Sequence, residues 1–236
     1  MSRFRQVKGD LRAILADEGW QARLEDLGAW PPGILVPPLL SLRLDRDEAV
    51  RWHSATAFGL TAERMAEASM EKARILMRTC MWYMNEESGN LGWGIPHFMG
   101  EAMARSERIA LEFHKVFVSY IFCDEACDGN YLDHPELRRD VFWGLARLAE
   151  VRPGLVAHGE RFLAAALAEE DAFNRAHAAR VLGLIGAAPA REPLEGLRDD
   201  PAPVRTYLDR ELMDTTVGQM ASGALSALNA PVRREG

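Results

Sequence analysis

The order of apolar and polar residues divides the chain into a short N-terminal segment and a longer repetitive one. Between residues 10 and 27 the apolar residues recur at the spacing of one helix face, as is typical of an amphipathic helix. They are Leu11, Ile14, Leu15, Leu24 and Leu27. Because Gly19 interrupts the series, we expect a short helical hairpin or one kinked helix that caps the fold. The prolines that follow predict a Pro-rich linker, so residues 1–36 are expected to form a helical cap with its linker.

From residue 37 a different pattern recurs: an apolar stretch, an acidic turn, and a helix with an arginine in its first turn. The helix continues with small and apolar residues, as in residues 47–59 and 171–183. The arginines of successive copies are Arg51, Arg138, Arg175 and Arg205. They lie about 30 to 40 residues apart, with one gap of about twice that length, where residues 92–100 can supply the missing unit. Periods of this size indicate a solenoid of stacked helical pairs.

Residues 47–59, 174–183 and 199–205 resemble the HEAT-like repeat family, in particular the version named after the phycobilisome lyases. The resemblance covers about three quarters of the chain and implies an all-α fold, an α-α superhelix of about five helical pairs over residues 37–228. In that family the acid of the turn and the following arginine stack between neighbouring repeats. The resemblance therefore implies a structural ladder whose pairs are Asp47 with Arg51, Asp171 with Arg175, and Asp200 with Arg205.

Two segments depart from the repeat pattern. Residues 206–214 insert a polar stretch before Val217 resumes helical spacing, and we interpret this excursion as a loop or small hairpin. Residues 229–236 have no periodic pattern and are expected to form a disordered tail. Within the repeats, small residues such as Gly183 are expected to let adjacent helices approach closely.

Composition and charge limit the classes of partner. With 236 residues, 48% of them hydrophobic, the chain can bury a continuous core. The 35 acidic residues exceed the 28 basic ones and give a net charge of −7. This charge repels a phosphate backbone, so a nucleic acid is a disfavoured partner. The charged N-terminus, the sparse cysteines and the lack of an apolar stretch of about 18 residues predict a cytoplasmic protein without a membrane span.

Residues 85–96 are the most unusual stretch, because glycines, carboxylates and a tryptophan follow one another closely. The glycines do not match a phosphate-binding loop, which needs a lysine followed by Ser or Thr. Two interpretations stay open: a connection between helices with Trp93 packed on the core, or a binding loop presented from a rigid scaffold. The candidate binding residues are Glu86, Glu87, Asn90, Trp93, Phe98 and Trp143, with Trp82 and Tyr83 as further aromatic anchors.

Candidate metal ligands are sparse. Cys123 and Cys127 lie four residues apart, but one such pair is a weak metal signature, so we expect no metal and no cofactor. The acidic residues around this pair lack the ligand order of a calcium loop. The His-Glu dipeptides of the deoxyhypusine hydroxylases, which are HEAT-like di-iron enzymes, are missing. His53 and His177 are expected to be interior histidines with satisfied hydrogen bonds.

These observations favour an interaction protein over an enzyme, since no Ser or Cys lies in a recognisable nucleophile motif. The leading hypothesis is a non-enzymatic HEAT-like repeat scaffold that binds a protein partner. One alternative is a HEAT-like lyase or cofactor-handling enzyme, which a bound chromophore or metal would favour. Another is a HEAT-like DNA glycosylase, which the negative charge disfavours. The sequence leaves the partner's identity and the oligomeric state open.

Overall fold

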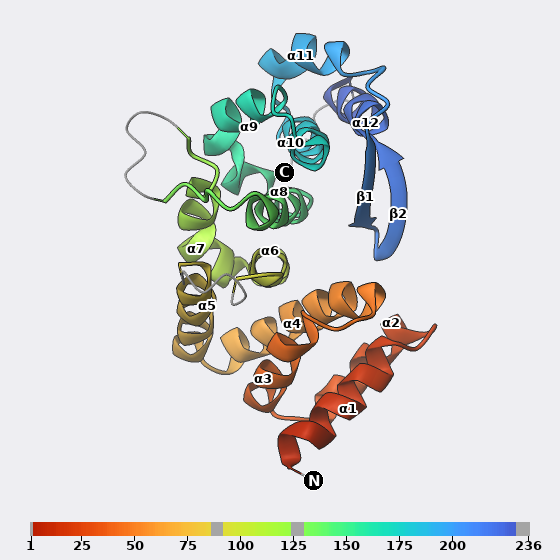
Figure 1. Ribbon diagram of the computed structural model, residues 1–236. Coiled ribbons are helices and arrows are strands. Elements are labelled where there is room, and N and C mark those ends of the chain that lie inside the picture. Colours follow the sequence, from red (N-terminus) through yellow and green to blue (C-terminus); the bar gives the residue numbers. More distant parts are fainter. Residues whose placement is uncertain (1, 86–91, 124–129, 230–236) are drawn as a thin grey trace. The chain divides into compact units, whose positions relative to one another are not determined.

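A computed structural model of the chain describes residues 2–85, 92–123 and 130–229. The chain forms two compact units, residues 1–114 and 115–236. The boundary between them falls within helix α7 (Glu107–Ser119). Figure 1 labels the helices and strands of both units.

The described part of the first unit is helical. Its elements before α7 are α1 (Arg3–Leu15), α2 (Trp20–Arg23), the 3-10 helix η1 (Leu24–Ala29), α3 (Pro32–Leu42), α4 (Glu48–Ala68), α5 (Met70–Met84) and α6 (Ile95–Arg105). Helices α1 and α2 are separated at Gly19, as the helical-hairpin interpretation expects. The role of residues 1–36 as a cap stays a prediction.

The second unit combines helices with one hairpin. Its longer helices are α8 (Pro135–Ala149), α9 (Glu160–Ala166), α10 (Ala172–Leu184), α11 (Arg191–Gly196) and α12 (Val217–Asn229). Its 3-10 helices are η2 (Pro153–Leu155), η3 (Ala157–Gly159) and η4 (Ala188–Ala190), and its strands are β1 (Pro203–Leu208) and β2 (Glu211–Thr216).

Helix α4 is central to the first unit, because it packs against both α3 and α6 (Figure 1). Its N-cap, Asp47, accepts a hydrogen bond from an amide of the first turn, which satisfies one of the free helix-end donors. The rings of Phe58 and Phe98 pack with their centroids 4.4 Å apart. At Gly59 an added Cβ would lie 3.0 Å from backbone atoms of Glu101 in α6. The two helices therefore approach closely at this glycine.

The segment expected to be a Pro-rich linker is helical, and here the structure departs from the sequence prediction. Helix α3 begins with Pro32, whose missing N–H would have no partner at a helix start in any case. The helix continues through Pro37 and Pro38, which each remove an intrahelical hydrogen bond. It nevertheless buries Leu35 and Leu39 completely. Packing of this apolar face outweighs the lost hydrogen bonds, since tertiary contacts supply most of a helix's stability in a protein.

Three of the four repeat arginines hold the turn before their helix in the same way. Each donates from Nη1 to the carbonyl oxygens of two consecutive turn residues. The distances are 2.9 and 3.4 Å for Arg51, 3.0 and 3.3 Å for Arg138, and 2.8 Å to both carbonyls for Arg175. Main-chain carbonyls of a packed turn need such partners. In these three repeats, the arginine that recurs in the sequence is therefore the residue that fixes the turn.

Ionic contacts between repeats of the second unit join an arginine to the turn acid of the following repeat. Arg139 Nε lies 2.5 Å from Asp171 Oδ2, and Arg175 Nη2 lies 2.9 Å from Asp200 Oδ2. Asp171 and Asp200 each also accept a main-chain N–H two residues ahead. Each of these acids thus fixes its own turn and pairs with the previous repeat.

The ladder implied by the resemblance pairs each turn acid with the arginine that follows it in the same repeat. The contacts in the structure join other residues. Asp47 caps α4, and Arg51 binds carbonyl oxygens of its turn. Arg205 lies in β1 and pairs with the exposed Asp214. In the repeats of Asp47 and Asp171 the acid accepts an N–H at the start of its helix, and the following arginine donates to the carbonyls of the turn before that helix.

Helices α10 and α12 are the most closely packed pair of the second unit. A Cβ added at Gly183 would lie 2.6 Å from the Cα of Ala224, so the two backbones meet without an intervening side chain. The residues that flank this contact on α10, Ala179 and Leu182, are fully buried. The expectation that Gly183 permits a close helix approach is confirmed.

Strands β1 and β2 form an antiparallel hairpin beside α12 (Figure 1). Their register runs from the pair Pro203–Thr216 to the pair Leu208–Glu211. Asp209 and Arg210 form the two-residue turn with φ of 50° and 67°, the left-handed conformation that a type I′ turn requires at both positions.

The two ends of the hairpin lie next to each other, where the chain leaves the helical repeat and returns to it. Val217 N–H donates to the carbonyl of Ala202 over 3.1 Å, and Gly218 N–H donates to that of Asp200 over 3.0 Å. Helix α12 therefore begins directly beside the residues that precede β1.

All described elements other than this hairpin are helical, and the predicted all-α fold class is confirmed. The hairpin itself was one of the two interpretations of residues 206–214, and the structure begins it at Pro203. No described helix combines the length and the apolar character needed to cross a membrane. The expected tail lies outside the described residues, apart from Asn229 at the end of α12.

Candidate functional site

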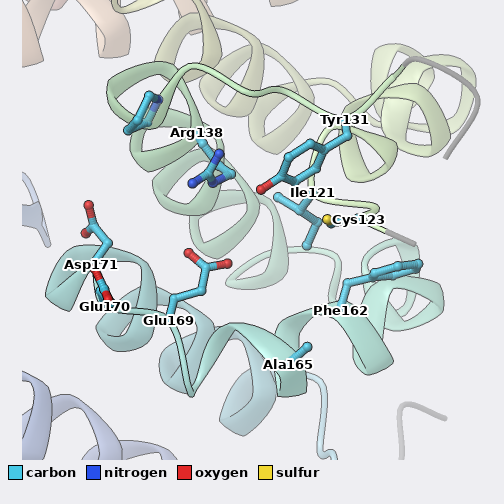
Figure 2. Close-up of a pocket in the computed structure, with 10 residues that line it drawn as sticks. Ile121, Cys123, Tyr131, Arg138, Phe162, Ala165, Glu169, Glu170 and Asp171 are labelled. Carbon is cyan, nitrogen blue, oxygen red and sulfur yellow. The ribbon is translucent and has the colours of Figure 1, made fainter. Parts of the chain in front are cut away.

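The second unit contains a cavity of about 630 Å³ near the starts of α8 and α10, a volume in the range of ligand sites in proteins. We call it the charged cavity (Figure 2). It is lined by Ile121, Cys123, Tyr131, Pro135, Arg138, Phe162, Ala165, Glu169, Glu170 and Asp171. These residues come from the segment after α7, from α8 and α9, and from the turn before α10.

Arg138 and Tyr131 form one side of the charged cavity. The Arg138 guanidinium carbon lies 5.2 Å from the centroid of the Tyr131 ring, within the range of a cation–π contact. Nη1 of Arg138 binds the turn carbonyls of Leu132 and Asp133, so the guanidinium is held in place. Burial raises the pKa of Tyr131 above its ordinary value, and the nearby Arg138 opposes this rise. The Tyr131 hydroxyl therefore stays protonated at neutral pH.

The opposite side of the charged cavity carries three consecutive carboxylates, Glu169, Glu170 and Asp171. In Figure 2 the Glu169 carboxylate points toward the space beneath Arg138 and Tyr131. Its Oε2 accepts a hydrogen bond of 2.8 Å from the amide of Asn174, which fixes its direction.

Asp171 and Glu170 differ in whether their carboxylates have partners within the protein. Asp171 is occupied, since it caps α10 and pairs with Arg139. The Glu170 side chain is exposed and has no hydrogen-bond or ionic partner within the described parts of the chain. Glu170 is thus the carboxylate of this lining that a ligand can engage without breaking an internal contact.

The apolar floor of the charged cavity is formed by Phe162 of α9. Its ring stacks on Phe122 at a centroid distance of 4.2 Å, and the Arg161 guanidinium carbon lies 4.3 Å from its centroid. The ring is consequently fixed, and it offers the cavity an apolar edge. Cys123, which also lines the cavity, is a free and exposed thiol.

Metal ligation at the cysteine pair is outside what the structure describes, because Cys127 is not among the described residues. Within the residues that are described, no group of three or more His, Cys, Asp or Glu side chains is arranged to hold a metal ion.

In the first unit, three aromatic residues flank the central loop, Trp82, Tyr83 and Trp93, and we refer to these three residues as the aromatic surface. Trp82 is 54% exposed and Trp93 is 38% exposed, and the Trp82 and Tyr83 rings contact edge to face at 5.3 Å. Buried Arg43 contacts residues on both sides of the loop. Its Nε donates to the carbonyl of Trp93 over 2.8 Å, and its guanidinium carbon lies 5.6 Å from the centroid of the Tyr83 ring. Gly94 has a φ of 72°, the left-handed conformation that glycine adopts without strain.

Arg43 replaces the repeat arginine at this position. Burial lowers the pKa of Arg43, yet the guanidinium binds the carbonyls of Trp93 and Leu40. Helix α6, which supplies the unit missing from the repeat spacing, has Phe98 where the other repeats have arginine. An arginine from the end of α3 thus holds the turn before α6.

The structure separates the sequence candidates into three groups. Phe98 and Trp143 are 1% and 3% exposed, so both belong to the core and neither ring is available to a partner as it stands. The Trp143 indole N–H donates to the carbonyl of Tyr207 over 2.7 Å. Trp93 remains partly exposed on the aromatic surface. The other three candidates, Glu86, Glu87 and Asn90, lie outside the described residues, and their role in binding stays a prediction.

The two histidines expected in the interior do have partners. His53 Nδ1 lies 2.7 Å from the carbonyl oxygen of Leu15, and its ring stacks on Trp20 at 3.8 Å. Fully buried His177 lies 2.9 Å from the hydroxyl of Thr206. His177 is thus an interior residue and His53 a partly buried one, and each has a hydrogen-bond partner.

Sequence reasoning missed the charged cavity, although it singled out three of its residues. Arg138 was identified by the repeat spacing, Asp171 as the acid of its turn, and Cys123 as a candidate metal ligand. Tyr131 and Glu169 carry no spacing signal, because they reach the cavity from segments almost 40 residues apart. Only the packing of α8 against α10 brings them together.

No protein-family model matches the sequence, and neither does any curated protein. A designed armadillo repeat protein of known structure is 17% identical, with a TM-score of 0.53 over 94% of this chain and 93% of that one. A second designed armadillo repeat protein, in complex with the peptide (KR)4, is 15% identical, with a TM-score of 0.51 over 97% of this chain and 100% of that one. An archaeal HEAT-like repeats protein from Thermococcus onnurineus NA1 is 13% identical, with a TM-score of 0.45 over 97% of this chain and 83% of that one. The first two likenesses show that the chain has a helical-repeat fold.

Proposed function

We propose that the protein is a non-enzymatic helical-repeat scaffold that binds a protein partner, and that the charged cavity receives a lysine or arginine side chain of that partner. The observation that carries this proposal is the composition of the cavity lining, in which Glu169, Glu170 and Asp171 oppose a single guanidinium, that of Arg138.

Charge favours a cationic ligand in this cavity. Three carboxylates and one guanidinium line the cavity, and Arg139 pairs with Asp171 from outside the lining, so the formal charge of this group is −1, that is −3 + 2. A concave site lined by one sign of charge concentrates ions of the opposite sign. The Arg138 guanidinium is engaged with its own turn, whereas the Glu170 carboxylate has no internal partner among the described residues.

The shape of the lining favours a long side chain over a bare ion. Phe162 and the ring of Tyr131 offer apolar surface beside the carboxylates, which suits the methylene groups of lysine or arginine. A folded or extended protein segment presents such a side chain on a backbone that can contact the rim.

A protein partner also agrees with the charge of the whole chain. The net charge of −7 disfavours a nucleic acid and favours a basic protein surface. One structural neighbour was solved with a peptide of lysine and arginine, (KR)4. Its likeness to this chain concerns the fold, so it serves here as a choice of probe.

The aromatic surface of the first unit is proposed as a second contact for the partner. Trp82 and Trp93 expose large rings, and aromatic side chains dominate the energetics of protein interfaces. Glu86 and Glu87 of the loop between them belong to this proposal as well.

Binding of a fluorescein-labelled (KR)4 peptide tests the proposal for the charged cavity. Glu170→Gln and Glu169→Gln should each weaken binding by about fivefold to tenfold, since each removes one negative charge at the ligand. Glu192→Gln on α11 is the matched control, because Glu192 is exposed and lies outside the cavity lining. Equal weakening by all three variants would show that the peptide follows the overall charge and would refute the assignment of the cavity. A chromophore or stoichiometric metal that copurifies with the protein would favour the lyase alternative.

A further inference from the structure

The outer edge of strand β2 has main-chain groups that point away from the hairpin. In a hairpin with a two-residue type I′ turn, the residues that flank the turn form a hydrogen-bonded pair, and the pairs then alternate. Leu208 and Glu211 flank the turn here. Leu212 and Asp214 consequently belong to pairs without mutual hydrogen bonds, so their N–H and C=O groups face the outer edge.

The opposite edge of the hairpin supports this assignment. Tyr207 is the pairing partner of Leu212, and its carbonyl accepts the Trp143 indole N–H rather than a strand hydrogen bond. At Tyr207 the outer edge of β1 is therefore engaged by a side chain of α8. On β2, within the described residues, the main-chain groups of Leu212 and Asp214 have no such partner.

Among the features that usually protect a sheet edge, strand β2 has only charged side chains, Glu211 and Asp214. Proteins block such edges with charged residues, above all lysine, and with proline, bulges or very short strands. The six residues of β2, Glu211–Thr216, include neither proline nor lysine, and its pairing with β1 is regular over that length. Met213 at its middle is 42% exposed. This edge can accept a further strand.

A cavity of about 330 Å³ lies between this strand and the helices behind it. Its apolar lining comes from the hairpin, from α10 and from α12: Leu184, Leu208, Met213, Met220, Ala224 and Ala227. Thr215 also lines it. Because side chains alternate along a strand, Met213 and Thr215 project to the cavity side of the sheet. A strand added beside β2 places every second side chain on that same side.

We propose that β2 binds an extended segment of a partner protein by strand addition, and that one apolar side chain of the segment enters this cavity. Main-chain hydrogen bonds then supply affinity and the cavity supplies specificity, as in other cases of strand addition. The inference rests on the proposed function only in that the partner is a protein, because it uses none of the residues of the charged cavity.

Charge decides between a partner and a second copy of this chain. Glu211 and Asp214 lie on the strand, and Asp209 and Arg210 form the turn beside it. Asp214 is paired with Arg205 of β1, so the three carboxylates of this region exceed its two guanidinium groups by one. Self-pairing would bring a second set of these carboxylates to the same edge, which is unfavourable for like charges in neighbouring strands. A segment with lysine or arginine beside its apolar residue complements the edge instead.

Two substitutions block the edge and the cavity separately. Leu212→Pro removes an outward-facing N–H and takes no hydrogen bond from the hairpin. Gly223→Leu places a side chain at the cavity wall, where an added Cβ meets no atom within 4 Å, so the variant should fold. Gly223→Ala is the matched control, since it adds only a methyl group at the same position.

The probe is a random peptide library displayed on phage and selected against the full chain, with the same selection run in parallel on Gly223→Leu. We expect the selected peptides to alternate apolar and polar residues, to carry basic residues, and to bind about tenfold or more weakly to Leu212→Pro and Gly223→Leu. Binding to Gly223→Ala and to Glu170→Gln should stay within about twofold, which separates this site from the charged cavity. N-methylation of every second peptide amide gives two alternative sets. Only the set whose N–H groups face β2 should abolish binding when it is methylated.

Three results would overturn the inference. The first is the absence of any peptide enriched on the full chain over the Gly223→Leu bait. The second is equal binding of selected peptides to the full chain and to both blocking variants, each shown to be folded by thermal melting. The third is a concentration-dependent dimer that Leu212→Pro dissociates, which would assign the edge to a second copy of the chain.

Discussion

Replacing Arg175 with leucine should destabilise the second unit more than any exposed charge in it. Arg175 is 15% exposed and Asp200 is 18% exposed. The Arg175 guanidinium donates four hydrogen bonds. Nη1 donates to the carbonyls of Glu169 and Glu170 at 2.8 Å each, and Nε and Nη2 donate to Asp200 Oδ2 at 3.2 and 2.9 Å. The side chain thereby joins its own turn to the turn of the next repeat.

The expected loss follows from these contacts. A hydrogen bond that involves a charged group contributes about 1.5–3 kcal/mol, and one between neutral groups about 0.5–1.5 kcal/mol. Water can reach part of the site, and Asp200 keeps its hydrogen bond from Ala202 N–H, so the contributions do not simply add. We expect Arg175→Leu to lower the free energy of unfolding by about 2–4 kcal/mol. Arg175→Lys should lose most of this amount, because one ammonium cannot reach both carbonyls and the carboxylate.

Arg205→Leu is the matched control, since Arg205 and Asp214 are 52% and 78% exposed and such surface pairs contribute less than about 1 kcal/mol. Urea denaturation followed by far-ultraviolet circular dichroism measures both variants, with the slope of the transition checked for constancy. An Arg175→Leu loss below about 1 kcal/mol, or an equal loss for Arg205→Leu, would refute the role assigned to the repeat arginine.

The pH dependence gives a second test of the same contact. The hydrogen bond from Ala202 N–H lowers the pKa of Asp200, burial opposes the shift, and Arg175 adds to the lowering. A lowered folded-state pKa contributes stability above the unfolded value of about 3.9, and this stability is lost as the pH falls through the folded value. The difference between the natural chain and Arg175→Leu should therefore be largest near neutral pH and should shrink below about pH 4.

Three further predictions concern other parts of the chain. Gly183→Leu should cost about 3 kcal/mol or more in unfolding free energy, because its side chain has no room against α12, and a chain that melts normally would contradict this packing. Burial raises the pKa of Cys80 to about 12, so mass spectrometry after alkylation of the folded protein at mildly alkaline pH should find Cys80 unmodified, and rapid labelling would contradict its burial. Glu86→Ala with Glu87→Ala should weaken partner capture without changing the melting temperature if the loop binds. If the loop only connects helices, capture should be unchanged and Trp93→Ala should instead be the destabilising change.

The helices were predictable because apolar periodicity reports directly on which face is buried. The repeat arginines were predictable as positions, since they recur at a fixed place relative to each helix start. Their partners were not, because the contact from Arg175 to Asp200 depends on how one repeat stacks on the next. The prolines of α3 misled for a related reason: local propensity disfavours a helix there, and burial of Leu35 and Leu39 reverses the balance.

The candidate sites were predictable only in part. A tryptophan in the sequence does not show whether its ring is buried, so Trp143 and Trp93 look equivalent until the packing of each is known. The charged cavity combines residues from four separate segments, and the cavity beside β2 depends on the tilt of a hairpin. The residues that line these two cavities do not recur at a fixed spacing in the sequence.

The main-chain contact between Ala202 and Val217 joins the two ends of residues 203–216, so this segment is an insertion in the helical repeat whose ends meet. The chain leaves and re-enters at neighbouring atoms, and Gly218 seals the junction, because a Cβ there would lie 2.4 Å from the carbonyl oxygen of Arg198. The entropic cost of closing a loop between ends that already meet grows only slowly with loop length. Segments of different length and chemistry can thus be accommodated at this junction while α10 and α12 keep their contact.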